Sequence, residues 1–185
     1  HLDISKSWVG GEIGSLRELT DLAFLNLAWT YIEGYSDDDE LAALGRMVKL
    51  RFLDISTTFG KDVAVPLKRL TSLTHLDVHN YHGVVDAAGL GRLTSLKSLS
   101  LSGDKISGGL NEVANLTQLT ALVLWCGGEE CGVSPDALSG LVNLVDLDLT
   151  MNVDVSGRST PLLAGMQKLR ALSFVSKDED DTFTL

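Results

Sequence analysis

Aromatic residues, proline, cysteine and positive charge are all scarce in this sequence. Its 185 residues include 5 Phe, 3 Tyr, 3 Trp, 3 Pro and 2 Cys, and 15 basic residues stand against 25 acidic ones. The formal net charge of −10 opposes sequence-independent binding to nucleic acid or to an anionic membrane surface. No apolar run approaches the roughly 18 residues that a membrane-spanning helix needs. We therefore expect neither a nucleic-acid partner nor membrane insertion.

Leucine, by contrast, is abundant, with 34 copies, and one nine-residue phrase accounts for most of them. Apolar residues stand at positions 1, 4, 7 and 9 of this phrase, as in Leu19-Thr-Asp-Leu22-Ala-Phe-Leu25-Asn-Leu27. The full copies span residues 19–27, 47–55, 70–78, 93–101, 116–124, 141–149 and 166–174, and Leu2 and Ile4 end an eighth. The equivalent leucines at position 7 are separated by 23, 28, 23, 23, 23, 25 and 25 residues.

The last three positions of each copy predict a short strand, because the alternation places two apolar residues on one face. No single unit can bury that face alone. Stacking the units makes one shared core, with the strands side by side in a parallel sheet. Composition and repeat length therefore predict a solenoid.

The phrase resembles the leucine-rich-repeat family, and the resemblance covers nearly the whole chain. It implies an α/β fold: a right-handed, horseshoe-shaped solenoid of about eight repeats, with a parallel sheet on the concave face and short helical or 3₁₀ turns on the convex face. We expect residues 1–176 to form this solenoid, with a truncated first repeat, and residues 177–185 to form an acidic tail. The stretch 106–110 is similar to plant-specific repeats and Leu-Thr-Ser-Leu to bacterial and protozoan ones, so the subclass stays open.

Helical or 3₁₀ turns are predicted at residues 39–46, 87–92, 111–115, 134–141 and 160–166. The apolar residues expected to point inward from the convex side are Leu41, Leu44, Leu67, Leu90, Val113, Leu138 and Leu163. The family usually has Asn five residues after the equivalent Leu, and Asn152 is the one position that matches; the others are Ser7, Thr30, Thr58, Tyr81, Asp104 and Gly127. Ser, Thr and Asp can partly substitute by bonding local backbone, so the turns near Tyr81 and Gly127 should be less regular.

Outward strand residues are the candidate ligand contacts, since partners of this family usually lie on the concave sheet. We expect Phe24 and Phe52 to be neighbours, with Trp29 close by, and Trp125 to form a second apolar spot with Met151. Exposed aromatics ringed by polar groups are typical of binding hot spots; ordinary surface aromatics are the alternative. The full set of predicted contact residues is Phe24, Asn26, Trp29, Phe52, Asp54, His75, Asp77, His79 and Trp125.

The sequence gives little evidence of catalysis or of metal or cofactor binding. We predict no catalytic residue, no metal site and no cofactor. Cys126 and Cys131 bracket a short Gly-rich stretch that either closes into a local disulfide or leaves two reduced thiols. The acidic stretch 37–40 lacks the ligand spacing of an EF-hand loop. His75 and His79 are too far apart along a strand to share one metal, but with Asp77 between them they suggest a pH-sensitive patch.

The first functional hypothesis is therefore a protein-interaction module without catalysis of its own, which binds a protein or peptide. Two alternatives stay open: a targeting or regulatory region of a larger enzyme such as a kinase, ligase or cyclase, and a structural surface protein. Because the chain opens inside a repeat, at His1-Leu2-Asp3-Ile4, we expect it to be part of a longer solenoid. Uncapped repeats would also permit end-to-end self-association.

Overall fold

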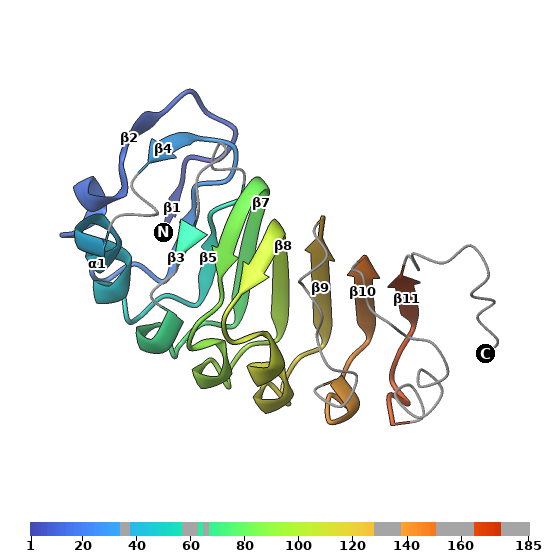
Figure 1. Ribbon diagram of the computed structural model, residues 1–185. Helices are drawn as coiled ribbons and strands as arrows, with labels where there is room; N and C mark the ends of the chain where they lie inside the picture. The colour runs from blue at the N-terminus through green and yellow to red at the C-terminus, as the bar shows by residue number, and fades with distance from the viewer. Residues whose placement is uncertain (34–37, 57–62, 65–66, 128–137, 151–164, 175–185) are drawn as a thin grey trace.

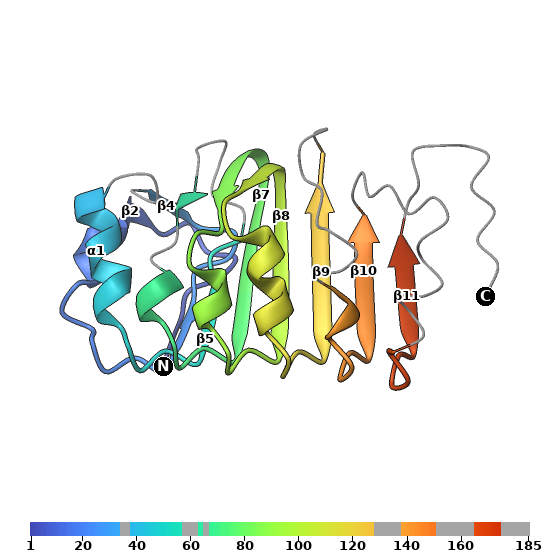
Figure 2. The same cartoon turned by 60° about the horizontal axis from the view of Figure 1, so that its bottom comes forward.

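The chain forms one extended parallel sheet with short helices along one of its faces (Figures 1 and 2). The computed structural model describes residues 1–33, 38–56, 63–64, 67–127, 138–150 and 165–174. Within them the main sheet has the order β1 (Leu2–Asp3), β3 (Phe24–Asn26), β5 (Phe52–Asp54), β7 (His75–Asp86), β8 (Ser98–Ser107), β9 (Ala121–Cys126), β10 (Asp146–Thr150) and β11 (Ala171–Phe174). A further strand, β6 (Val63–Ala64), pairs with the far end of β7, and β2 (Gly10–Glu12) pairs with β4 (Tyr31–Glu33) in a separate small sheet.

The sheet register follows the repeat. Leu2 lies opposite Leu25, Leu25 opposite Leu53, and the pairing continues strand by strand to Leu147 opposite Leu172. A one-residue slip would turn every leucine of a strand to the other face, so burial of the leucine face fixes this register. The predicted equivalence of the eight repeats is confirmed.

The helices cover the face into which the leucines point. They are η1 (Ile13–Leu16), α1 (Asp38–Arg46), η2 (Leu67–Arg69), η3 (Leu90–Arg92) and η4 (Leu110–Asn115). The turns predicted at 39–46, 87–92 and 111–115 are confirmed, whereas residues 134–137 and 160–164 of the other two predicted turns lie outside the described residues. None of the described helices is long and apolar enough to cross a membrane.

The core is a continuous stack of the repeated apolar positions. Leu44, Leu90, Val113 and Leu138 are completely buried beneath the convex side, as predicted; the side chains of Leu41, Leu67 and Leu163 lie outside the described part. Full burial of one such side chain contributes about 1.5–3 kcal/mol before entropy costs. Toward the ends of the array Leu2 and Leu172 are only partly buried, because within the described residues each is packed against a neighbouring repeat on one side.

The turns after the first strands use side-chain hydroxyls where the family usually has asparagine. Ser7 Oγ donates to the Ile4 carbonyl, and Thr30 Oγ1 donates to the Leu27 carbonyl at 2.7 Å. This confirms that Ser and Thr substitute through local backbone bonds. Farther along, the pairing of β7 with β8 shifts register between Asn80 and Val84, in agreement with the irregular turn expected near Tyr81.

Candidate functional site

A row of four rings, three stacked and the fourth tilted, runs across the open face of the sheet, opposite the helices, and we call His1, Phe24, Phe52 and His75 the aromatic row. Phe24 and Phe52 stack with centroids 4.2 Å apart and planes 9° apart. His1 stacks on Phe24 at 4.0 Å, and Phe52 contacts His75 at 6.0 Å and a 32° tilt. The register pairs Phe24 with Phe52, and Phe52 with His75, directly across neighbouring strands, so the predicted contact between Phe24 and Phe52 is confirmed.

The aromatic row also has a structural value. Stacked aromatic pairs contribute about 0.5–1.5 kcal/mol beyond the area that they bury, and both phenylalanines remain partly exposed. Because neighbouring rings stack face to face, their edges lie open to solvent, and each ring is held in place by its neighbours. Such rings lose little entropy when a ligand covers them.

A row of polar side chains runs beside the rings and caps the ends of the first strands through hydrogen bonds to the backbone. The Asp3, Asn26 and Asp54 side chains each accept a hydrogen bond from the backbone N–H two residues later, at 3.0, 3.1 and 2.9 Å. These bonds satisfy backbone groups where each short strand stops. Asn26 and Asp54, both predicted contact residues, therefore have a structural role that the sequence pattern did not reveal.

Asp77 and His79 lie at the centre of a hydrogen-bonded network on β5, β7 and β8. His79 Nε2 is 2.9 Å from Asp77 Oδ1 and 2.7 Å from Ser100 Oγ. Ser56 Oγ donates to the same Asp77 oxygen at 3.2 Å. We call Asp54, Ser56, Asp77, His79 and Ser100 the His79 network.

The His79 network shifts the pKa of two of its members, His79 and Asp54. The hydrogen bond to Asp77 raises the pKa of His79 above its ordinary 6.5, against an opposing effect of burial, and the charges of Asp77 and Asp54 raise it further. Burial raises the pKa of Asp54 above 3.8, although its bonds from Ser56 act in the opposite direction. Near neutral pH the site therefore combines an imidazole that readily becomes cationic with carboxylates on its sheet neighbours.

Stability should fall as pH rises through the raised pKa of His79. The imidazolium is favoured in the folded chain, so its contribution is complete below pH 6.5 and is lost as pH rises through the folded-state pKa. Asp54 titrates in a separate acidic window that begins above 3.8. Denaturation from about pH 5 to about pH 9, with an NMR titration of His79, measures the effect. Asp77→Asn should lower the imidazole pKa and flatten the curve; an unchanged titration would contradict the proposed pairing.

The two histidines do not form the joint patch suggested by their spacing. His75 contacts Phe52, and its Nδ1 lies 2.9 Å from Thr74 Oγ1, whereas His79 belongs to the carboxylate network. Only His79 therefore has the carboxylate contact expected of a pH-sensitive group. Within the part of the chain that the structure describes, no group of three or more His, Cys, Asp or Glu is placed to hold a metal ion.

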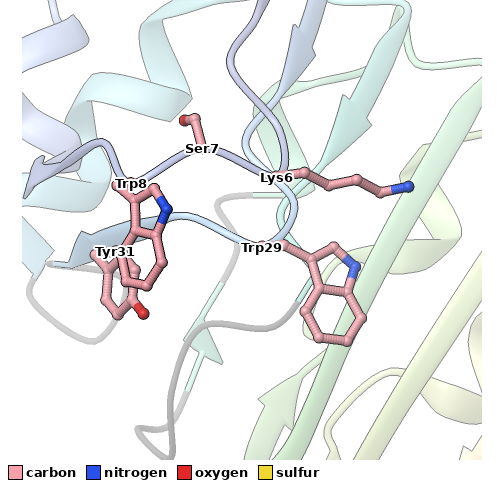
Figure 3. Close-up of a pocket in the computed structure, with 5 residues that line it drawn as sticks. All are labelled: Lys6, Ser7, Trp8, Trp29 and Tyr31. Atoms are coloured by element: carbon pink, nitrogen blue, oxygen red, sulfur yellow. The ribbon is translucent and has the colours of Figure 1, made fainter.

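Trp29 belongs to a pocket beyond the strand ends. A pocket of about 400 Å³ is lined by Lys6, Ser7, Trp8, Trp29 and Tyr31, and we call these residues the edge pocket. Trp8 and Tyr31 stack at 5.6 Å with planes 14° apart. Figure 3 shows their rings side by side, with the Trp29 ring across from them and the Ser7 hydroxyl pointing away from the gap. The sequence interpretation associated Trp29 with Phe24 and missed Trp8 and Tyr31.

Four residues of the edge pocket form two pairs, and each pair takes one residue from each of two neighbouring repeats. Lys6 and Trp29 are 23 residues apart, as are Trp8 and Tyr31, so each pair occupies one repeat position. The same 23-residue spacing, used to pair residues that follow the strand phrase, would have predicted from the sequence that these side chains are neighbours. Lys6 and Trp29 have φ angles of 54° and 59°, a left-handed conformation that costs a residue with a side chain roughly 1–2 kcal/mol. A bulky tryptophan is unusual there.

The second apolar spot and the cysteines are only partly described. Trp125 is half-buried on β9, and Met151 lies outside the described residues. Cys126 is buried and disulfide-bonded. Cys131 lies outside the described residues, so its pairing with Cys126 stays a prediction, as does the acidic tail 177–185. Of the acidic stretch 37–40, residues 38–40 begin α1.

Solved structures with the same architecture come from bacteria and plants. The chain is similar to a leucine-rich-repeat protein of Leptospira interrogans, at 22% identity and a TM-score of 0.66 over 93% of this chain and 44% of that one. It is similar to the Arabidopsis receptor kinase HAESA, at 21% identity and a TM-score of 0.70 over 95% of this chain and 30% of that one. An internalin from Listeria monocytogenes matches at 21% identity and a TM-score of 0.62, over 94% of this chain and 80% of that one.

Comparison by sequence alone, unlike comparison by structure, finds no similar protein. No protein-family model matches the sequence, and neither does any curated protein. The chain spans less than half the length of the Leptospira protein and of the plant receptor. At these identities the likeness lies in the fold, which agrees with the eight in-register strands and the stacked leucine core. The chain is therefore a leucine-rich-repeat solenoid.

Proposed function

We propose that this chain is a protein-interaction module that binds an extended protein or peptide segment on the open, concave face of its sheet and has no catalytic activity of its own. The observation that supports this most strongly is the aromatic row, in which His1, Phe24 and Phe52 stack, His75 tilts against Phe52, and both phenylalanines stay partly exposed. The row lies beside the carboxylates of the His79 network. Rigid aromatic surface next to charge is the combination that dominates binding energy in many interfaces.

The chemistry of the face favours a basic and apolar partner. An arginine guanidinium can pair with the partly exposed carboxyl group of Asp77, and an apolar side chain next to that arginine can pack against the edges of the Phe24 and Phe52 rings. The net charge of −10 would steer such a segment toward the chain. We therefore infer a segment that carries arginine next to an aromatic or aliphatic residue.

Proteins with this architecture provide independent support. Two of the similar structures are complexes, one of HAESA with the peptide hormone IDA and the co-receptor SERK1, the other of PEPR1 with AtPEP1. The chain spans only 30% and 26% of those receptor chains. A targeting or regulatory role within a larger enzyme is thus a second candidate, since HAESA is a receptor kinase; a structural surface role is a third.

A selection from displayed random peptides would test the proposal and define the preferred ligand sequence in one experiment. Peptides enriched on the 185-residue chain should contain arginine beside apolar residues. Their affinity, measured by fluorescence anisotropy, should fall about 30-fold or more in Phe24→Ala/Phe52→Ala, because two central aromatic contacts are lost. Thermal unfolding would show the separate cost of the lost stacking.

The matched control removes exposed apolar groups elsewhere. Val48→Ala/Val142→Ala changes two valines that are 50% and 48% exposed in the turns before their strands, and it should bind the selected peptides like the wild type. If the phenylalanine variant also binds like the wild type, the aromatic row is not the binding surface.

A further inference from the structure

The edge pocket concentrates the exposed apolar surface of the chain. Seven large hydrophobic side chains are exposed among the described residues, and four of them, Trp8, Val9, Trp29 and Tyr31, lie at or next to this pocket. Trp8 is 88% exposed and Trp29 is 55% exposed. Contiguous exposed aromatics of this kind mark interaction sites more often than neutral surface.

The backbone beneath the pocket is held firmly. Lys6 N–H donates to the Ala28 carbonyl at 2.8 Å, and Trp29 N–H donates to the Ser56 carbonyl at 3.1 Å. Tyr31 N–H donates to the Val9 carbonyl at 2.9 Å, which ties the two repeats together. The rings therefore stand on an ordered frame, and a ligand would not have to order it first.

We propose that the edge pocket binds a proline-rich segment in the extended polyproline conformation. Prolyl rings pack their C–H groups against flat aromatic faces, and such segments are recognised by grooves lined with aromatic rings. The polyproline helix has no internal hydrogen bonds, so its carbonyls need outside donors. The Lys6 ammonium and the Trp8 indole N–H are donors of the required kind.

The other ligand classes fit less well. Lys6 lines the pocket, and its positive charge opposes the cations that aromatic cages bind. One lysine on a chain of net charge −10 gives weak attraction to anions. A saccharide brings many hydroxyls, each needing a partner once buried, whereas the pocket is lined mainly by aromatic faces. The class of ligand that fits best is therefore a neutral one with few hydrogen-bonding groups.

Indole NMR signals give a site-specific test, because the chain has three tryptophans. Titration with a decaproline peptide should shift the indole N–H signals of Trp8 and Trp29 and leave that of Trp125 in place. Trp8→Ala should weaken binding about tenfold or more. Trp29→Gly should weaken it similarly and keep the fold, since glycine adopts a φ of 59° without strain.

Two comparisons separate this site from the aromatic row. Phe24→Ala/Phe52→Ala should bind decaproline like the wild type, even if it no longer binds the selected peptides. Val142→Ala, at an exposed position away from the pocket, should also be unchanged. The proposal is overturned if decaproline leaves the indole signals of Trp8 and Trp29 unmoved, if all three indoles shift alike, or if cellohexaose shifts them and decaproline does not.

Discussion

Leu93→Ala is expected to lower the free energy of unfolding by about 2–5 kcal/mol, the usual cost of a buried leucine truncation. Leu93 is completely buried in the centre of the array. It opens the repeat phrase, and its carbonyl accepts the turn-closing bond from the Leu96 N–H at 2.9 Å. The mutation keeps this backbone bond and removes apolar contacts with the neighbouring units. Urea unfolding followed by circular dichroism measures the loss.

Leu19→Ala is the matched control, because the same residue type occupies the same repeat position. Its carbonyl also closes the turn, accepting from the Leu22 N–H at 3.2 Å, but its side chain is 42% exposed. We expect a loss of about 1 kcal/mol or less. Equal losses for the two variants would show that position in the phrase, and not burial within the stack, determines the energy.

Gly109→Ala is expected to destabilise the chain by about 2–5 kcal/mol, the sum of overpacking and left-handed strain. Gly109 precedes η4 with a φ of 56°, and a Cβ built on it would lie 2.1 Å from the Ala87 carbonyl oxygen. That oxygen belongs to the backbone of the neighbouring repeat, so the two turns would have to separate. The fall in the urea midpoint at an unchanged m-value would report it.

Gly140→Ala provides the comparison for this clash. No heavy atom outside its chain neighbours lies within 4 Å of a Cβ placed on Gly140, and the residue is exposed. Its stability should stay within about 0.5 kcal/mol of the wild type. A large loss at Gly140, or none at Gly109, would contradict the close approach of the turns.

The repeat phrase alone was sufficient to predict the architecture. An apolar residue at every second strand position and a fixed distance between copies leave one arrangement that buries all the leucines, namely in-register stacking. The contact between Phe24 and Phe52 followed directly, since equivalent positions of neighbouring repeats must be adjacent. The hydroxyl bonds of Ser7 and Thr30 were predictable because they are local to one turn.

Only the tertiary structure determined the features that depend on the direction of a side chain or on neighbours outside the nine-residue repeat phrase. The left-handed backbone at Trp29 places its ring in the edge pocket with Trp8 and Tyr31, and no propensity scale predicts that conformation for tryptophan. His79 pairs with Asp77 while His75 contacts Phe52, although both lie on one strand. Leu19 is exposed and Leu93 buried at the same repeat position, because burial in a stacked array depends on the repeats on either side.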